Sequence, residues 1–411
     1  MNDSTPTRGV GNFASDLGNR GVVEGSVAPG YEMVAREFVA NFTSRGDTGA
    51  TLCIYRHGIP VVDLWGGWSN PKNKVPYTGD TLQLVFSTTK GLATACMLRL
   101  VQQGKIELDT PVSKVWPEFA AAGKATVPLR WLLSHKAGLP TIDIRLKLDD
   151  VLAWTPVVDA LAAQTPYWEP GSAHGYHALT YGWLIGEVVR RVSGRSLGRF
   201  FADEIAGPLG LDTWIGLPEE HEHRVAPLRM RALPSAADLH SHSRNVLFTM
   251  LKPDSLLLRA LTLNGAFGMA LGRKSGPFNS QALHSAEIPA ANAITNARSL
   301  ALMYAAMIGE VNGIRILSDS TIKQASAVES TGPDRVLVVP TTFGLGFMCH
   351  SNFAPMLGEG SFGHPGLGGS LAFANPQNGI SFAYVMNQLR LGLAGDERTT
   401  RLIDALNVCV S

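Results

Sequence analysis

The sequence predicts an α/β (α+β) fold in which an antiparallel sheet with flanking helices adjoins an α-rich lobe. Two strand-like runs surround His57-Gly58 near the beginning of the chain, and a second such pair surrounds Asn378-Gly379 near its end. The segments between these pairs have mostly helical periodicity. Because both ends carry strand patterns, we expect them to build one sheet together, with a functional site between the sheet and the helical lobe.

The length of the chain indicates two lobes. Its 411 residues exceed the usual size of one compact domain, and its 45% hydrophobic content suffices for a large core. We expect a discontinuous α/β sheet domain from residues 1–86 and 320–411, and a mainly helical domain from residues 87–319.

The first predicted helix covers residues 31–45. Val34, Phe38 and Phe42 recur at i, i+4 and i+8, which places one apolar stripe against a core. The next segment, TLCIYRHGIPVVDLWGG, predicts a hairpin that turns at its His-Gly pair.

Four further helices are predicted in the middle of the chain and one near its end. Their ranges are 92–103, 179–192, 196–206, 296–309 and about 396–409. The last of them follows the second hairpin, in which Asn378-Gly379 occupies the place of a tight type I′ turn.

Charge and hydropathy exclude several classes of function. The formal net charge is +1, from 35 basic and 34 acidic residues, so no strong field would gather nucleic acid or an anionic membrane surface. No apolar run approaches the roughly 20 residues of a membrane-spanning helix. We therefore expect a neutral small molecule as substrate, with no nucleic acid and no membrane span; the oligomeric state is not predicted.

The N-terminus and the cysteines indicate a cytoplasmic protein. The polar, glycine-rich first 20 residues do not resemble an export signal. Cys53, Cys96, Cys349 and Cys409 lack the spacing of a zinc site and suit reduced thiols.

The stretch FSTTKG is the strongest candidate for chemistry. Ser87 follows a strand-like run and begins a helix, where free backbone N–H groups and the helix dipole favour negative charge. Lys90 is one turn further on, within reach of the Ser87 hydroxyl. A capping serine beside a solvated lysine is the alternative, but a cation in the first turn opposes the dipole and Gly91 adds helix cost. The spacing therefore favours a serine nucleophile with a lysine partner.

FSTTKG resembles the S-x-x-K motif of the serine β-lactamases and penicillin-binding proteins. The flanks LVQQGKIELDTPVSKVWPEF and LRWLLSHKAGLP are similar to the class C-like branch, closest in type to the family VIII carboxylesterases. Tyr176 in GYHALTYGW matches the tyrosine of the second motif, Y-x-N, and His364-Pro365-Gly366 stands at the third, K-T-G or H-x-G. The resemblance runs from about residue 30 to 390 and implies a β-lactamase/transpeptidase-like fold, which needs no cofactor and no metal.

Two departures from the lactamase pattern bear on the substrate. Ala178 replaces the Asn of Y-x-N, which in the lactamases resembles a holder for the substrate's acylamino group. His364 stands where the lactamases place a Lys that meets the β-lactam carboxylate, and an ordinary imidazole is mostly neutral at pH 7. Both changes favour an uncharged carboxylic ester.

The resemblance also implies roles for individual residues. Ser87 is expected to attack the ester carbonyl, with the Lys90/Tyr176 pair as base and the Tyr176 pKa lowered by the adjacent ammonium. The backbone N–H groups of Ser87 and Leu367 are expected to form the oxyanion hole. His364 and Gly366 are expected at the substrate, where His364 shapes the pocket or hydrogen-bonds Tyr176, with a solvent-facing histidine as the alternative. Trp65, Trp168 and Phe278 are aromatic candidates for substrate contact in an acyl pocket, with core packing as the alternative for each.

Other serines and histidines have simpler interpretations. Ser196 in GRSLG matches a lipase-type G-x-S-x-G pattern, but it follows a helical segment, so we expect it to begin the next helix. His135 is expected to pack and hydrogen-bond locally, and His177 either supports the site or is exposed. The remaining paired histidines lie in loop-like segments without metal-site spacing: His221, His223, His240 and His242.

The predicted function is that of a serine hydrolase that cleaves short-chain carboxylic esters through an acyl-enzyme on Ser87. Three alternatives remain open: an acyltransferase that uses the same acyl-enzyme, an amide hydrolase of the β-lactamase or D-aminopeptidase type, and a non-hydrolysing penicillin-binding sensor.

Overall fold

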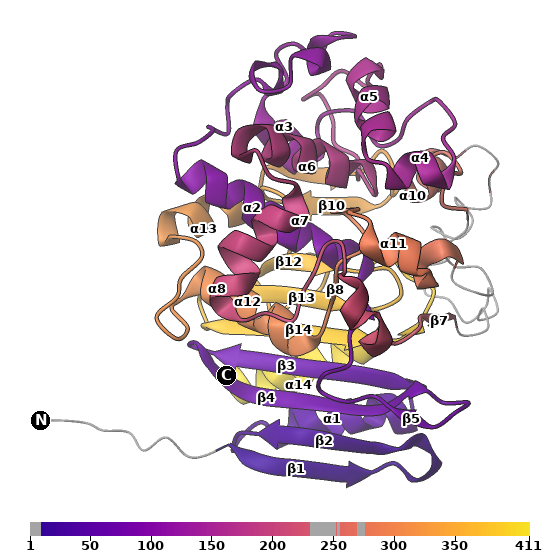
Figure 1. Cartoon of the computed structure of the whole chain (residues 1–411). Helices are drawn as coiled ribbons and strands as arrows, with labels where there is room; N and C mark the ends of the chain where they lie inside the picture. Colours follow the sequence, from indigo (N-terminus) through magenta and orange to yellow (C-terminus); the bar gives the residue numbers. More distant parts are fainter. Residues whose placement is uncertain (1–9, 231–251, 253–254, 269–275) are drawn as a thin grey trace, which may run out of the picture.

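The computed structural model describes residues 10–230, 252, 255–268 and 276–411 of the chain. Within these residues, eleven strands form one antiparallel sheet to which both ends of the chain contribute (Figure 1). The strands follow one another in the order β1 (Gly11–Asp16), β2 (Val22–Val27), β4 (Ile59–Asn70), β3 (Gly49–Arg56), β14 (Ile380–Met386), β13 (Leu371–Asn375), β12 (Phe362–Pro365), β11 (Met348–Cys349), β10 (Pro340–Phe343) and β9 (Ser330–Pro333), while β5 (Val75–Pro76) pairs with β4. The predicted α/β fold with one antiparallel sheet is confirmed.

The pairing of β3 with β14 joins the two ends of the chain. Their register runs from Ala50 opposite Met386 to Arg56 opposite Ile380. Every residue of β14 is buried, because helices cover both faces of the sheet. Helices α1 (Glu32–Thr43) and α14 (Glu397–Val410) pack together on one face, and α12 (Ala297–Ile308) packs against β3, β13 and β14.

The first predicted hairpin is confirmed, whereas the turn predicted for the second is wrong. β3 and β4 turn through His57 and Gly58, which both have positive φ, as a type I′ turn requires. Between β13 and β14 the loop has four residues, and of the Asn378-Gly379 pair only the glycine has positive φ. The Asn375 side chain accepts a hydrogen bond from the Asn378 N–H, which stabilises the longer loop.

Strands β1 and β2 were not predicted from the sequence. They form the outer edge of the sheet, and most of their side chains are exposed or half-buried. Only Val23 and Val27 are buried, so the apolar alternation is too weak to identify strands from the sequence.

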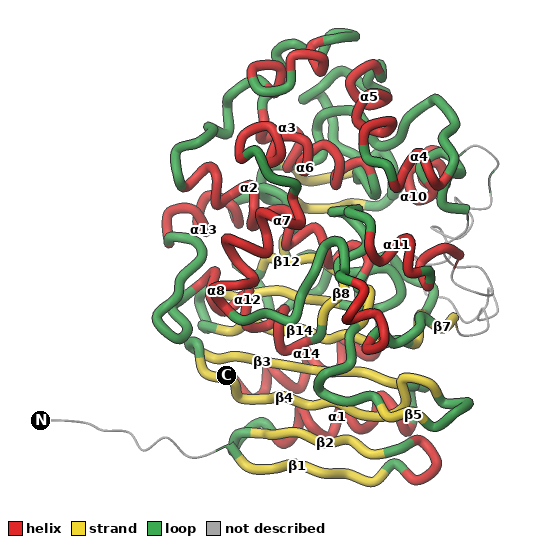
Figure 2. The backbone as a smooth tube through the Cα atoms, viewed as in Figure 1, coloured by secondary structure: helices red, strands yellow, loops and turns green. Residues whose placement is uncertain are grey.

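The predicted helices agree with the structure, except that the segment 196–206 is divided. Its first part is α7 (Leu197–Phe201), and residues 202–206 form a π-helical turn. Figure 2 shows most helices gathered at one end of the molecule, beyond the sheet. The remaining α-helices are α2 (Thr89–Gln102), α3 (Leu129–Leu133), α4 (Leu148–Leu152), α5 (Thr155–Ala163), α6 (Thr180–Ser193), α8 (Gly207–Leu209), α10 (Leu256–Thr262), α11 (Gln281–Ser285) and α13 (Asp319–Ser326).

The division into domains 1–86 with 320–411, and 87–319, stays a prediction. Helix α12 falls in the second range and nevertheless packs on the sheet. Among the described residues, no helix is long and apolar enough to cross a lipid bilayer. All four cysteines are free thiols, and Cys409 is the least buried of them.

A tight contact joins the β12–β13 turn to the segment before α2. The Ser370 hydroxyl donates to the Val85 carbonyl at 2.9 Å and lies 3.2 Å from Thr88 Oγ1. A Cβ on Gly366 would lie 2.1 Å from Ser370 Oγ and 2.3 Å from the Val85 oxygen, so only glycine fits there. Two turns that are far apart in sequence are thereby held against each other.

Replacing Ser370 with alanine tests this contact. The buried Val85 carbonyl would keep only the longer hydrogen bond from the Thr88 N–H, at 3.3 Å, so we expect Ser370→Ala to lower the free energy of unfolding by about 0.5–1.5 kcal/mol. Urea denaturation followed by circular dichroism measures the change, with the exposed Ser44→Ala as control. Equal stabilities of the two variants would contradict this expectation.

Candidate active site

Ser87 lies where the short strand β6 (Gln83–Leu84) ends and α2 begins. It occupies a 3-10 turn, Phe86–Thr88, and it is the one residue from Thr81 to Lys90 that is not buried. The preceding Phe86 has a φ of 47°, a strained conformation for a bulky residue that is typical of functional sites. The strand-to-helix junction predicted for this serine is confirmed.

Lys90 is fully buried in the first turn of α2, directly beneath the serine. Its Nζ lies 3.3 Å from Ser87 Oγ, 2.7 Å from the Ala178 carbonyl oxygen and 3.0 Å from that of Ala290. In the part of the chain that the structure describes, no carboxylate lies within ion-pair distance of this nitrogen. Burial therefore lowers the Lys90 pKa well below its usual value.

The contacts of Lys90 suit a neutral amine. A neutral amine has two N–H donors and one lone pair, and the site offers two carbonyl oxygens and one hydroxyl. In the neutral form, donation to Ala178 and Ala290 uses both N–H groups and the lone pair faces Ser87 Oγ, whereas in the ammonium form the third N–H donates to Ser87 Oγ.

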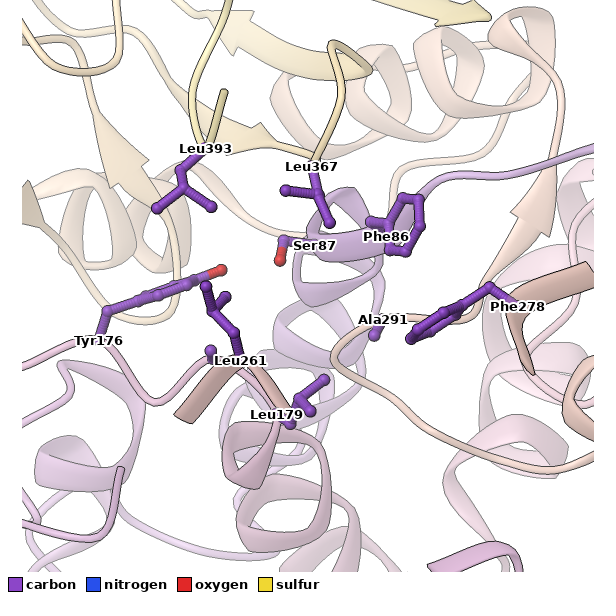
Figure 3. A pocket seen from close by; sticks show the side chains of 10 residues that line it. Phe86, Ser87, Tyr176, Leu179, Leu261, Phe278, Ala291, Leu367 and Leu393 are labelled. Carbon is purple, nitrogen blue, oxygen red and sulfur yellow. The ribbon is translucent and has the colours of Figure 1, made fainter. Parts of the chain in front are cut away.

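Tyr176 faces Ser87 from the other side of the site. The oxygens of the two side chains point toward one another (Figure 3). The Asp334 carboxylate accepts the Tyr176 backbone N–H at 3.1 and 3.0 Å, which fixes the segment, and Lys90 Nζ lies 4.8 Å from the centre of the tyrosine ring. The structure thus brings together Ser87, Lys90 and Tyr176, as the motif spacing predicted.

The predicted low pKa of Tyr176 is wrong. Burial raises the Tyr176 pKa above its usual value, and the hydrogen bond with Ser87 opposes this only in part. The prediction assumed a charged Lys90, but burial disfavours charge on both groups. The electrostatics therefore favour a neutral phenol beside a neutral amine.

A small apolar cavity opens in front of Ser87 and Tyr176. Its volume is about 40 Å³. The other residues that line it are Phe86, Ala178, Leu179, Leu261, Phe278, Ala291, Leu367 and Leu393. None of these side chains is charged, so the cavity suits a small uncharged group.

Phe278, which lines one wall of this cavity, is fixed by aromatic contacts and by a hydrogen bond to its carbonyl. Its ring centre lies 5.0 Å from that of Phe86 and 5.6 Å from that of Phe267. His284 donates from Nε2 to the Phe278 carbonyl at 2.9 Å, and its Nδ1 lies 2.9 Å from Glu222. The aromatic contact proposed for Phe278 from the sequence is therefore present at the cavity.

Two backbone N–H groups near the serine are without partners among the described residues. One belongs to Ser87 and the other to Leu367, in the turn between β12 and β13. The Gly369 N–H donates to the Gly366 oxygen at 3.2 Å, which sets the plane of the peptide that bears the Leu367 N–H. An oxyanion hole is formed by free N–H donors of this kind.

His364 does not line the cavity, although the sequence predicted substrate contact. It is buried, and its ring stacks on Tyr176 with 5.8 Å between the ring centres. Nδ1 donates to the Pro365 carbonyl at 2.7 Å, while Nε2 has no partner within the described ranges. Burial and the nearby Lys90 lower the His364 pKa to about 3, so the imidazole is neutral, as predicted.

Trp65, Trp168 and Gly366 are not among the residues that line this cavity, and their contacts with a substrate stay predictions. Trp65 lies on β4, where its ring meets the Arg298 guanidinium at 5.7 Å. The Trp168 indole N–H donates to the Ala173 carbonyl, and its ring packs against His177. Both indoles thus contact neighbouring protein groups. Gly366 instead allows the close approach of Ser370 and the Val85 carbonyl.

The histidines near the site are structural. His177 Nε2 accepts the Leu139 N–H at 2.9 Å, and His135 Nδ1 accepts the His177 N–H at 3.1 Å. Both rings are fully buried, and burial lowers the pKa of each, to about 3 for His177. His177 thus supports the Tyr176 segment and is not exposed, and His135 packs locally as predicted.

Ser196 caps a helix, as predicted. Its Oγ accepts the Arg199 N–H at the start of α7 and donates to Glu287 at 2.5 Å. His221 and His223 lie in a short 3-10 helix, Glu219–Arg224. His240 and His242 lie outside the described residues.

Sequence reasoning missed several residues that shape the site. Asp334 and Ser370 are polar but belong to no motif, and Leu261 and Leu393 are ordinary apolar residues from distant segments. For Ser370 the sequence did contain a signal, the glycine-rich segment GHPGLGGS, because glycines are needed where two backbones approach closely.

The site has a serine at a helix start, with a buried lysine beside it and a tyrosine facing it. Together with the free N–H groups nearby, this arrangement is that of a serine hydrolase. The profile of the Beta-lactamase family matches residues 35–407, and the chain belongs to this family. The predicted resemblance is thereby confirmed.

Several known proteins are similar over most of the chain. Esterase/beta-lactamase LipL of Mycobacterium tuberculosis (strain ATCC 25618 / H37Rv) is 35% identical over 384 residues, covering 91% of this chain and 84% of that protein. A crystal structure of a family VIII carboxylesterase superposes with a TM-score of 0.83 at 35% identity, covering 94% of this chain and 99% of that chain. A penicillin-binding protein homolog from Caulobacter crescentus gives 0.81 at 37% identity, with the same coverages.

Labelling with a fluorophosphonate distinguishes the two candidate serines. We expect the adduct on Ser87, because this serine lies at the cavity beside backbone N–H groups that have no partner among the described residues, whereas Ser196 Oγ accepts a helix N–H and donates to Glu287. Ser196→Ala should keep full labelling and lose about 1 kcal/mol of stability, the usual worth of a helix cap. An adduct on Ser196, read by mass spectrometry of tryptic peptides, would reverse the assignment.

Proposed function

We propose that this protein hydrolyses short-chain carboxylic esters through an acyl-enzyme on Ser87. The observation that carries the proposal is the 3.3 Å distance between Ser87 Oγ and Lys90 Nζ. The lysine is buried with no carboxylate partner among the described residues, and the serine lines an apolar cavity. A serine is a weak nucleophile until a neighbouring group accepts its proton, and a neutral amine at this distance can do so. The esterase names among its relatives support the same reaction class.

In the acylation step, Ser87 Oγ forms a bond to the ester carbonyl carbon and its proton passes to Lys90. The carbonyl oxygen becomes an oxyanion, which the N–H groups of Ser87 and Leu367 stabilise. When the tetrahedral intermediate collapses, the C–O bond to the alcohol breaks. Tyr176 donates its proton to the departing alkoxide and regains one from the Lys90 ammonium, which leaves both groups neutral.

In the deacylation step, the same groups act on water. Tyr176 takes a proton from the water that attacks the acyl carbon and passes its own proton toward Lys90, so no lasting phenolate forms. Collapse of the second intermediate returns the proton to Ser87 and releases the carboxylic acid. The neutral resting state of Lys90 and Tyr176 is thereby restored.

The cavity supports an uncharged acyl donor. Its lining offers no cation for the carboxylate of a β-lactam, since His364 lies behind Tyr176 and is neutral. Ala178 provides no side-chain amide for an acylamino group. The cavity volume of about 40 Å³ leaves room for only a few methylene groups.

Comparing two substrates tests the selectivity. We expect kcat/KM for p-nitrophenyl butyrate to exceed that for nitrocefin by more than about tenfold, corresponding to 1.4 kcal/mol of transition-state preference. Ser87→Ala should abolish both activities. A better turnover of nitrocefin than of the ester would exclude the esterase assignment.

The proton path is tested by pH profiles of Lys90→Met and Tyr176→Phe. Because burial lowers the Lys90 pKa, the amine is neutral above that pKa and kcat should fall as pH drops through it. Each variant should lose about 10²–10⁴ in kcat, and Lys90→Met should also lose the acidic limb of the profile. The double variant should be little worse than either single one. Near-normal kcat in Tyr176→Phe would leave Lys90 as the only base.

A further inference from the structure

Arg398 is the first-turn residue of α14 and is fully buried, although it lies outside every catalytic motif. Its guanidinium donates to the carboxylates of Asp47 at 2.6 Å and Asp396 at 2.5 Å. It also donates to two main-chain carbonyls, Gln388 at 2.8 Å and Gly368 at 2.7 Å. A buried guanidinium is costly unless all of its donors are satisfied, and here two acids and two carbonyls do so.

The Gly368 contact reaches the turn that carries Leu367. The Gly368 carbonyl also accepts the Arg390 N–H at 3.1 Å, and the Gly368 N–H donates to Gly392 at 3.3 Å. A Cβ on Gly369 would lie 2.3 Å from Arg398 Nη2, so the backbone of the turn rests directly on the guanidinium. Arg398 therefore supports this turn through Gly368 and Gly369 and does not itself line the cavity.

The turn is held on its other side by Ser370, which is tied to Val85 and Thr88 around the nucleophile. The glycines of the turn, Gly368 and Gly369, have φ values of 87° and 128°. Glycine permits these conformations but does not select them, because it has many others available. The hydrogen bond from Gly369 to Gly366 sets the peptide plane within the turn, and contacts from outside hold the turn as a whole in place beneath the cavity-lining Leu367.

We propose that Arg398 is a positioning residue that holds the Gly366–Gly369 turn so that the Leu367 N–H points at the oxyanion. This inference rests on the proposed function, because it assumes that Leu367 supplies an oxyanion donor. The rigid, planar fork of arginine spans Asp47, Asp396 and Gly368 at once. A lysine would keep the charge between the acids but has a single nitrogen, so it would release Gly368.

The test compares Arg398→Lys with Arg298→Met, which removes an ion pair with Asp63 away from the cavity. We measure kcat and KM for p-nitrophenyl butyrate and the inhibition constant of 1-butaneboronic acid, whose tetrahedral adduct places an oxygen at the oxyanion position. Arg398→Lys should lower kcat by about 10- to 100-fold and weaken boronate inhibition by a similar factor, with KM within about threefold. Arg298→Met should change none of these by more than about threefold.

Two results would overturn the inference. One is an Arg398→Lys protein with kcat and boronate inhibition within about threefold of the wild type. The other is an Arg398→Lys chain that does not fold by circular dichroism, because the residue would then be needed for stability rather than positioning. If the wild type resists the boronate and Ser87→Ala stays active, the proposed function itself fails, which is a different outcome from either.

Discussion

The burial of Lys90, with no carboxylate partner among the described residues, is the constraint from which the proposed chemistry of this site follows. Two main-chain carbonyls from separate segments, Ala178 and Ala290, accept its N–H groups and hold the amine beneath Ser87. A nearby carboxylate would favour the ammonium form and so remove the base proposed for Ser87. Placing a lysine at the start of a helix costs stability, since the dipole opposes its charge. That cost largely disappears when burial keeps the amine neutral.

The site depends on contacts between parts of the chain that are distant in sequence. The proposed nucleophile, Ser87, lies at the start of α2, whereas the proposed donor N–H of Leu367 belongs to a turn of the sheet. Ser370 joins these two segments by its hydrogen bond to Val85. The same turn is supported by Arg398, from the last helix. The pairing of β3 with β14 thus has a functional consequence, because it brings the C-terminal strands and helix into the sheet that carries this turn.

The sequence was most informative where chemistry requires a fixed spacing. Ser87 and Lys90 are three residues apart on one helix, so their contact followed from helical geometry, and Tyr176 followed from its motif. The cavity wall was not predictable in this way. Trp65 and Trp168 are of a type common in pockets, but the Trp65 ring contacts Arg298 and the Trp168 indole bonds to Ala173. Leu261 and Leu393 line the cavity only because the fold brings their distant segments together.

The direction of the Tyr176 pKa shows why electrostatics was harder to predict than geometry. Proximity of an ammonium and a phenol suggests mutual stabilisation of charge, but burial acts on both groups and is the larger effect here. The same effect leaves His364 and His177 uncharged. These shifts favour the neutral forms, so the oxyanion and the Lys90 ammonium are the new charges of the proposed acylation step. In that proposed step the backbone donors stabilise the oxyanion, so the residues that fix the direction of these donors are expected to affect the barrier as well as those that move protons.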